Sequence, residues 1–373
     1  MNKIGNQQML REINKALLLH LIHERGPVSR VELSRETKLS PSTVSILVDE
    51  VIREGLVHET GTSGSGVGRK MTMLEIKADS GYVVGIDLSN PRCVLLDMKG
   101  ELKAVQKIPR LIGAEQIRDE LAGTVMSFLE HHDIGLEQVR RIGISVPGRI
   151  DESKQTVIGA IPIGLDRLEL GAIMEEALGA PVQLVNDIDA AGFAERYNGT
   201  AQGLRTILYI LIDYGVGAGL VIDNHIYRGS SGRAGRTPEL GQFSMIRYAE
   251  SLKLQFPEHF AETATPEQTL QEFTRLGMSG TSPASDELER LVNDIAADCN
   301  RMLNLMNPEA VILSGWIAEE DALFAKLAAR IQELEHGVPE PTPVQAAHWK
   351  TNGAAVGAAT LGLHEMFRMM MID

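Results

Sequence analysis

Residues 26–57 read GPVSRVELSRETKLSPSTVSILVDEVIREGLV, and this stretch decides the fold of the N-terminal part of the chain. A short helix is expected from about Ser29 to Lys38, followed by a tight connection at 39–40. A second helix then begins, because Ser40 is a good N-cap and Pro41 suits the first helical position. Its buried stripe repeats at helical spacing: Val44, Leu47, Val48, Val51 and Ile52. The stretch therefore predicts a helix-turn-helix pair over about 29–54.

The residues on both sides extend this pattern. Residues 10–22, LREINKALLLHLI, form an amphipathic helix that ends before Gly26-Pro27. Residues 56–60 and 71–77, LVHET and MTMLEIK, alternate like two strands around a loop at 61–68 that contains four glycines. Three helices and a hairpin indicate a winged helix-turn-helix domain over residues 1–78. The alternative is a generic three-helix bundle, but the turn, the polar helix start and the basic hairpin favour DNA binding.

The residue types in this domain suit DNA recognition. The short hydroxyl side chains of Ser40, Ser42, Thr43 and Ser45 lie near the start of the third helix, where they can reach base edges or phosphates in the major groove. The free N–H groups of a helix start also favour a phosphate. Further candidate contacts come from the preceding helix and from the hairpin: Ser29, Arg30, Arg69 and Lys70.

Composition and charge agree with this division. The chain has 373 residues, of which 43% are hydrophobic and 23% charged, as in a globular protein with a real core. Residues 1–77 carry 11 Lys and Arg against 9 Asp and Glu, whereas the other 296 residues carry a balance of −16. A mildly basic head on an acidic body suits a DNA-contacting module joined to a small-molecule domain.

Other sequence features narrow the location and the chemistry. No apolar run is long enough for a membrane span, and no cleavage site follows the apolar centre of the first helix, so a cytoplasmic protein is expected. The two cysteines, Cys93 and Cys299, lie far apart and form no CxxC pair. Neither a disulfide framework nor a cysteine zinc site is therefore expected.

From residue 82 onward strands alternate with helices, which predicts an α/β protein with helix-covered sheets. Strands are expected over 82–88, 93–100, 101–108, 140–148, 182–187, 206–213, 219–224, 310–315 and 344–349. Helices are expected over 115–131, 167–178, 188–197, 266–276, 284–306, 319–335 and 353–366. We interpret this region as two lobes, residues 79–195 and 196–373.

Several ordered motifs then resemble a known family. These are GISVPGRID (143–151), VNDIDAAGFAERYNG (185–199), DYGVGAGLVIDNHIYRGSSGRAG (213–235), ELGQF (239–243) and LNLMNPEAVILSGW (303–316). Together with the N-terminal helices they resemble the ROK family (repressors, open reading frames and sugar kinases), on its repressor branch near xylose-repressor-type proteins. The resemblance implies a winged helix-turn-helix joined to a two-lobed, actin-like and ribonuclease-H-like sugar-kinase fold. It also implies that the second lobe, 196–373, carries dimerisation helices.

The resemblance further implies that the phosphate-binding parts of the kinase machinery are degenerate. Asn186-Asp187 matches the family's Asn-Asp pair, whose Asp takes the proton of the sugar hydroxyl. The first phosphate hairpin, however, reads DLSNP at 87–91 in place of Asp-x-Gly-x-Thr. The second loop keeps three glycines at 215, 217 and 219, but Asp213 and Tyr214 replace Gly and Thr. A magnesium-binding Asp213 is the alternative interpretation; otherwise ATP chemistry is expected to be lost, and the chain is expected not to be an enzyme.

The sugar-binding positions are partly kept. Glu239 matches the family's sugar-binding Glu, whereas Gln242 replaces the His that binds both sugar and zinc. The cysteine-rich zinc loop is replaced by SMIRYAESLKLQFPEHF at 244–260, so neither a metal nor another cofactor is expected and ordinary packing should hold this loop. The candidate ligand-binding set is Asn186, Asp187, Glu239 and Gln242, because sugar hydroxyls need a dense set of donors and acceptors.

These features predict a repressor of a carbohydrate operon, of the xylose-repressor type. It should bind a palindromic operator in double-stranded DNA as a homodimer, with pairing of dimers into tetramers left open, and a small sugar should release it. One alternative is a DNA-binding regulator that responds to another metabolite or to a partner protein. The other is an active sugar kinase with an added DNA module.

Overall fold

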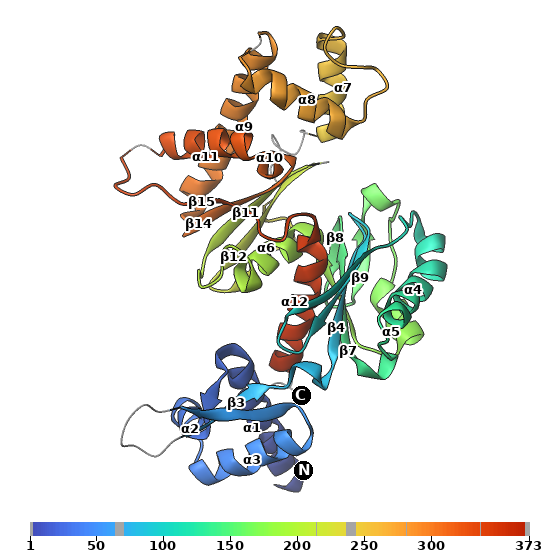
Figure 1. The fold of residues 1–373 in the computed structure, drawn as a ribbon. Coiled ribbons are helices and arrows are strands. Elements are labelled where there is room, and N and C mark those ends of the chain that lie inside the picture. Colours follow the sequence, from blue (N-terminus) through green and yellow to red (C-terminus); the bar gives the residue numbers. More distant parts are fainter. Residues whose placement is uncertain are drawn as a thin grey trace. The chain divides into compact units, whose positions relative to one another are not determined.

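The computed structural model describes residues 3–63, 71–213, 215–235, 244–280, 282–335 and 337–369, drawn as a ribbon in Figure 1. The chain divides into two compact units: Met1–Ile144, Asp151–Leu184 and Ala358–Asp373 form the first, and Ser145–Ile150 with Val185–Gly357 the second. This division differs from the predicted boundaries at 78 and 195. The N-terminal domain and the first lobe belong to one unit, and the last part of the chain returns to it.

The N-terminal part, which we call the head, has the predicted order of elements. In its described residues these are α1 (Lys3–Arg25), β1 (Val28–Ser29), α2 (Arg30–Thr37), α3 (Pro41–Arg53), β2 (Val57–Ser63) and β3 (Met71–Ile76). The strands form a sheet in the order β1-β3-β2. The sequence did not predict β1, because two residues carry no periodicity and become a strand only by pairing Val28 with Leu74.

The first lobe is built on a five-stranded sheet in the order β10-β7-β4-β5-β6. Its strands are β4 (Tyr82–Asp87), β5 (Arg92–Asp97), β6 (Leu102–Lys107), β7 (Val139–Val146) and β10 (Val182–Asn186). Figure 1 shows α4 (Ala114–His131) and α5 (Leu170–Leu178) on one face of this sheet and α12 (Gly353–Met369) on the other. Gly143 of β7 allows α12 to approach closely, since an added Cβ would lie 2.0 Å from the Ala358 carbonyl oxygen.

Shorter elements connect these. They are a two-stranded ribbon of β8 (Arg149–Asp151) and β9 (Thr156–Gly159), and 3-10 turns at Ala78–Ser80, Leu136–Gln138 and Ile161–Ile163. None of the helices in the described ranges has the length and apolar character needed to cross a bilayer.

The second lobe has a five-stranded sheet in the order β13-β12-β11-β14-β15. Its strands are β11 (Ile207–Ile212), β12 (Val216–Ile222), β13 (His225–Ile226), β14 (Ala310–Gly315) and β15 (Val344–Ala346). Its helices are α6 (Asp187–Asn198), α7 (Met245–Gln255), α8 (Pro266–Met278), α9 (Ala284–Met306), α10 (Trp316–Glu319) and α11 (Asp321–Glu333), and a 3-10 turn spans Lys350–Asn352.

Strand β11 is buried on both faces, which explains its continuous apolar sequence. Leu208, Ile210 and Ile212 join a core with the helices α7 to α11, whereas Ile207 and Tyr209 join the smaller core on the side of α6. Helix α7 was not expected as a helix. Residues 244–260 were predicted only to be held by ordinary packing, and Met245, Ala249 and Leu252 of α7 do lie in the first of these cores.

Candidate DNA interface and effector site

The start of α3 is held by its own hydroxyl groups. Ser40 is the N-cap, and its Oγ accepts a hydrogen bond from the Thr43 backbone N–H at 3.1 Å. The same Oγ lies 2.8 Å from the hydroxyl oxygens of both Ser42 and Thr43. Ser40 and Ser42 are exposed, and Thr43 and Ser45 are half-buried. The structure thus brings four of the predicted DNA contacts together on the first turns of one helix.

From the sequence, Arg30 is a candidate phosphate contact. In the structure its guanidinium is hydrogen-bonded within the head. Nη1 donates to the Asp49 carboxylate at 2.8 Å and to the Ser45 carbonyl oxygen at 3.3 Å. Nη2 donates to Glu59 at 3.2 Å. Arg30 therefore joins the start of α2 to α3 and β2, and it neutralises the carboxylate that α3 exposes.

Ser29 is buried and has a structural role. It is 1% exposed and caps α2, where its Oγ accepts from the Glu32 N–H at 3.3 Å. Glu32 in turn accepts from the Ser29 N–H at 2.8 Å, which completes a capping box and holds the pKa of Glu32 below its usual value. We therefore assign Ser29 to the cap and remove it from the set of proposed DNA contacts. Arg69 and Lys70 lie outside the described residues.

The outer face of α3 also carries an apolar residue that the sequence analysis did not single out. Ile46 is 56% exposed, although Leu47 and Val48 beside it are buried. The sequence could have predicted this exposure, since position 46 falls outside the buried stripe of α3. Val31 on α2 is likewise 65% exposed.

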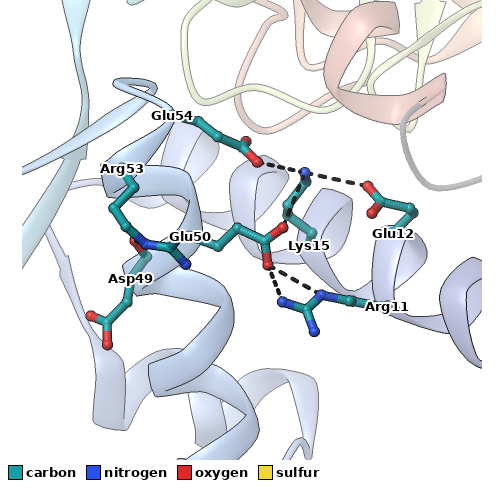
Figure 2. A network of polar contacts seen from close by, with 7 residues as sticks. All are labelled: Arg11, Glu12, Lys15, Asp49, Glu50, Arg53 and Glu54. Carbon is teal, nitrogen blue, oxygen red and sulfur yellow. Dashed lines mark hydrogen bonds and ion pairs between the residues drawn. The ribbon is translucent and has the colours of Figure 1, made fainter.

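A network of charges fixes α3 against α1, as Figure 2 shows. Arg11 donates to the Glu50 carboxylate through Nη2 at 2.6 Å and Nε at 3.2 Å. Lys15 lies between Glu54, at 3.0 Å, and Glu12, at 3.3 Å. The hydrogen bond from Arg11 lowers the pKa of Glu50. Partial burial works to lower the pKa of Lys15, but the hydrogen bonds to Glu54 and Glu12 prevail and raise it.

Asn186 and Asp187 lie together at the start of α6, as their motif predicts. Asn186 is the N-cap: its Oδ1 accepts from the N–H groups of Ile188 at 3.1 Å and Asp189 at 3.3 Å, and its Nδ2 donates to the Gly148 carbonyl at 3.1 Å. The Asp187 Oδ1 accepts from the Ile188 N–H at 3.0 Å, and Asp187 is half-buried. A carboxylate at a helix start is stabilised there, and carboxylate oxygens accept hydrogen bonds from hydroxyl groups.

Two glycines of the second phosphate loop, Gly217 and Gly219, have a packing role. Gly217 and Gly219 lie in β12, which runs against the start of α6. A Cβ on Gly219 would lie 2.9 Å from the Ile188 carbonyl oxygen, and one on Gly217 would lie 2.3 Å from the Ile188 side chain. Close approach of β12 thus supports the helix that carries Asn186 and Asp187. Tyr214 lies outside the described residues.

The two buried charged residues of the first phosphate hairpin make contacts within it. Asp87 and Arg92 face each other across β4 and β5, and both are buried. The Asp87 Oδ1 accepts from the Ser89 N–H at 2.8 Å, and the Arg92 Nε donates to the Asn90 carbonyl at 3.1 Å. The carboxylate at this hairpin is therefore committed to internal contacts.

Glu239 and Gln242 lie outside the described residues. Within the part of the chain that the structure describes, no group of three His, Cys, Asp or Glu side chains is arranged to hold a metal ion.

Residues 83–251 and 258–365 match the model of the ROK family, whose matched range leaves out the head. The xylose repressor of Bacillus spizizenii is 29% identical over 334 residues, 85% of this chain and 85% of the repressor. The DNA-binding transcriptional dual regulator NagC of Escherichia coli is 21% identical over 344 residues, 86% of this chain and 85% of NagC.

Two solved structures share the fold. A ROK family transcriptional regulator, a homologue of the E. coli MLC protein, aligns with a TM-score of 0.78 at 20% identity and covers 98% of this chain and 99% of its own. A ROK family glucokinase from Streptomyces griseus, in complex with glucose and AMPPNP, aligns with a TM-score of 0.63 at 24% identity, over 76% of this chain and 99% of its own. The predicted sugar-kinase-like fold is confirmed.

Proposed function

Since the chain belongs to the ROK family, we propose that it is a DNA-binding transcriptional repressor of a carbohydrate uptake or catabolism operon. A small sugar, bound at Asn186, Asp187 and the segment that holds Glu239 and Gln242, releases it from its operator. The observation that carries this proposal is the start of α3, where Ser40 and Ser42 are exposed. The names of the xylose repressor and of NagC support it.

The dimer follows from the same proposal. A homodimer presents two copies of α3 to a palindromic operator, and these must lie about 34 Å apart, or a multiple of that, to enter successive major grooves. A modest movement of the lobes on sugar binding changes that separation, and one copy of α3 then loses contact with its half-site. Helices of the second lobe supply the proposed dimer contact, and Arg69 and Lys70 of the wing supply phosphate contacts.

The internal contacts of the first hairpin support a binding protein over a kinase. Phosphoryl transfer requires a loop that cradles the ATP phosphates, and here Asp87 and Arg92 already pair across that hairpin. The expected result in a coupled ATP-consumption assay is no sugar-dependent turnover with common pentoses and hexoses. Turnover of ~1–100 per second that disappears in Asp187→Ala would contradict the proposal.

The decisive experiment measures operator release. Selection from random-sequence DNA identifies the operator. Calorimetry identifies the sugar, with a panel of pentoses and hexoses that includes xylose. Fluorescence anisotropy then measures the affinity for the operator. The sugar should weaken operator binding by roughly 5- to 150-fold, the range of ordinary coupling energies. Asp187→Ala should bind the operator normally and fail to release it, whereas Asp166→Ala, an exposed carboxylate of the first unit, should behave as wild type. Release of Asp187→Ala at the wild-type sugar concentration would show that the sensor lies elsewhere.

A further inference from the structure

The first half of α3 contains none of the side chains that read guanine or adenine most strongly. Residues 40–48 read SPSTVSILV, with no Arg, Lys, Asn or Gln. Bidentate contacts from Arg or Lys identify guanine, and those from Asn or Gln identify adenine. If this helix lies in the major groove, its central residues must therefore read bases with hydroxyl groups and apolar surface alone.

Ile46 is the apolar surface that this helix presents. It lies one turn after Ser42 and three residues before Asp49, so the three share one face. Its side chain is 56% exposed, while Val44, Leu47, Val48 and Val51 fill the core. The neighbouring Asp49 carboxylate is bound by Arg30 at 2.8 Å, which limits the repulsion between that charge and a phosphate backbone. The face is thus hydroxyl-bearing at its start and aliphatic at its centre.

The major groove contains one apolar group that matches an aliphatic side chain, the 5-methyl group of thymine. A hydroxyl group can donate or accept, so the serines discriminate weakly between bases, whereas a methyl group identifies thymine. We propose that Ile46 packs against a thymine methyl group in each operator half-site and is a main determinant of sequence preference. This inference rests on the proposed DNA-binding function.

The test removes only the methyl group. Deoxyuridine replaces thymine one position at a time in the selected operator, with base pairing unchanged, and anisotropy measures the dissociation constant. In the wild-type protein, one or two positions per half-site should lose about 4-fold in affinity, the value for one buried methyl-sized group. Those positions should be the ones where selection enriches thymine.

A double-mutant cycle assigns the effect to Ile46. In Ile46→Ala the same deoxyuridine substitutions should have no effect, and Ile46→Val should keep part of the sensitivity. Ile161→Ala is the matched control, because Ile161 is 91% exposed and lies in the first lobe. It should keep the full wild-type response. Melting temperatures near that of the wild type are expected for all three variants, since neither isoleucine is in the core.

The two hypotheses fail in different ways. If selection enriches no sequence, the proposed DNA-binding function fails. If selection succeeds but no thymine position is sensitive to loss of its methyl group, or if Ile46→Ala is as sensitive as the wild type, the operator is recognised without Ile46 and this inference is overturned.

Discussion

Arg30 illustrates how one residue can serve recognition without touching DNA. Its guanidinium contacts α3 twice, through Ser45 and Asp49, and β2 once, through Glu59. Arginine suits this position because its planar fork donates in several fixed directions, which lysine cannot reproduce. The contacts hold the start of α2 against the outer face of α3 and cover the Asp49 charge.

Replacing Arg30 should therefore affect DNA binding more than stability. Arg30→Ala removes partly exposed ion pairs, each worth ~0.2–1 kcal/mol, and it uncovers the Asp49 carboxylate. Urea unfolding should show a loss of about 1 kcal/mol, and anisotropy should show a larger loss of operator affinity. Adding Asp49→Asn should restore part of the affinity. Equal losses in both assays, with no rescue by Asp49→Asn, would make Arg30 a purely structural residue.

At the scale of elements, two helix starts carry the proposed chemistry. Ser40 caps α3 and Asn186 caps α6, and the positive end of each helix dipole favours an anionic or hydroxyl ligand there. Neighbouring elements hold both helices. Helix α1 holds α3 through the network of Figure 2, and β12 packs against α6 at its glycines.

Substitutions of Ser40 should separate the cap from DNA binding. Ser40→Ala removes the cap and should cost ~0.5–2 kcal/mol of stability. Ser40→Asp keeps a side-chain acceptor and favours the helix dipole, so stability should be retained, but its negative charge should repel phosphate and weaken operator binding. Thermal unfolding and anisotropy check the two expectations. Tight operator binding by Ser40→Asp would place the start of α3 away from the DNA backbone.

A matched pair of glycine substitutions tests the support of α6. Gly219→Ala places a Cβ 2.9 Å from the Ile188 carbonyl, whereas a Cβ on Gly215 meets nothing within 4 Å. Gly219→Ala should lose ~1–3 kcal/mol of stability, as overpacking does, and it should weaken sugar binding by displacing Asn186 and Asp187. Gly215→Ala should keep both the melting temperature and the calorimetric sugar affinity. Equal behaviour of the two variants would contradict a packing role for Gly219.

At the scale of the whole molecule, the head is attached to the first lobe by aromatic and histidine side chains of α1 and α12. The His23 ring stacks on Phe367 with centroids 4.5 Å apart. His20 contacts His364 at 6.0 Å, edge to face. A cavity of about 110 Å³ beside them is lined by residues of both parts: Leu19, Leu56, Ile76, Ser80, Met98, Arg140, Met366 and Phe367.

This junction should make stability depend on pH. Burial lowers the pKa of His23 from 6.5 to about 4; Glu24 acts in the opposite direction, and His364 and His20 act in the same one. The unfolded chain therefore binds the proton first. The contribution of neutral His23 to the free energy of unfolding is complete above pH 6.5. It is lost as the pH falls toward 4, and the loss is at most about 3 kcal/mol.

Melting temperatures between pH 8 and 4.5 measure this effect. His23→Phe should keep the stack with Phe367 and flatten the fall below pH 6.5. His225→Gln, at an exposed position of β13, should follow the wild-type profile. If the curve of His23→Phe runs parallel to that of the wild type, the acid sensitivity arises at other groups.

The sequence was sufficient for local structure and for part of the candidate site. The N-cap at Ser40 and the stripe of α3 follow from chemistry and spacing within a few residues, and the Asn186-Asp187 motif predicted its own place at a helix start. The partners of Arg30 were not predictable, because Asp49 and Glu59 lie 19 and 29 residues away. The return of the chain after Ala358 to the first compact unit was not predicted for a similar reason.

The sequence by itself thus determined the helices of the head, the alternation of strands and helices, and the family that these motifs resemble, because hydrogen bonding, capping and periodicity act over a few neighbouring residues. Only the tertiary structure decided that Arg30 contacts both α3 and β2, and that Gly219 makes room for α6. Those outcomes depend on which distant surfaces meet, and one chain's spacing does not encode that choice in any short segment.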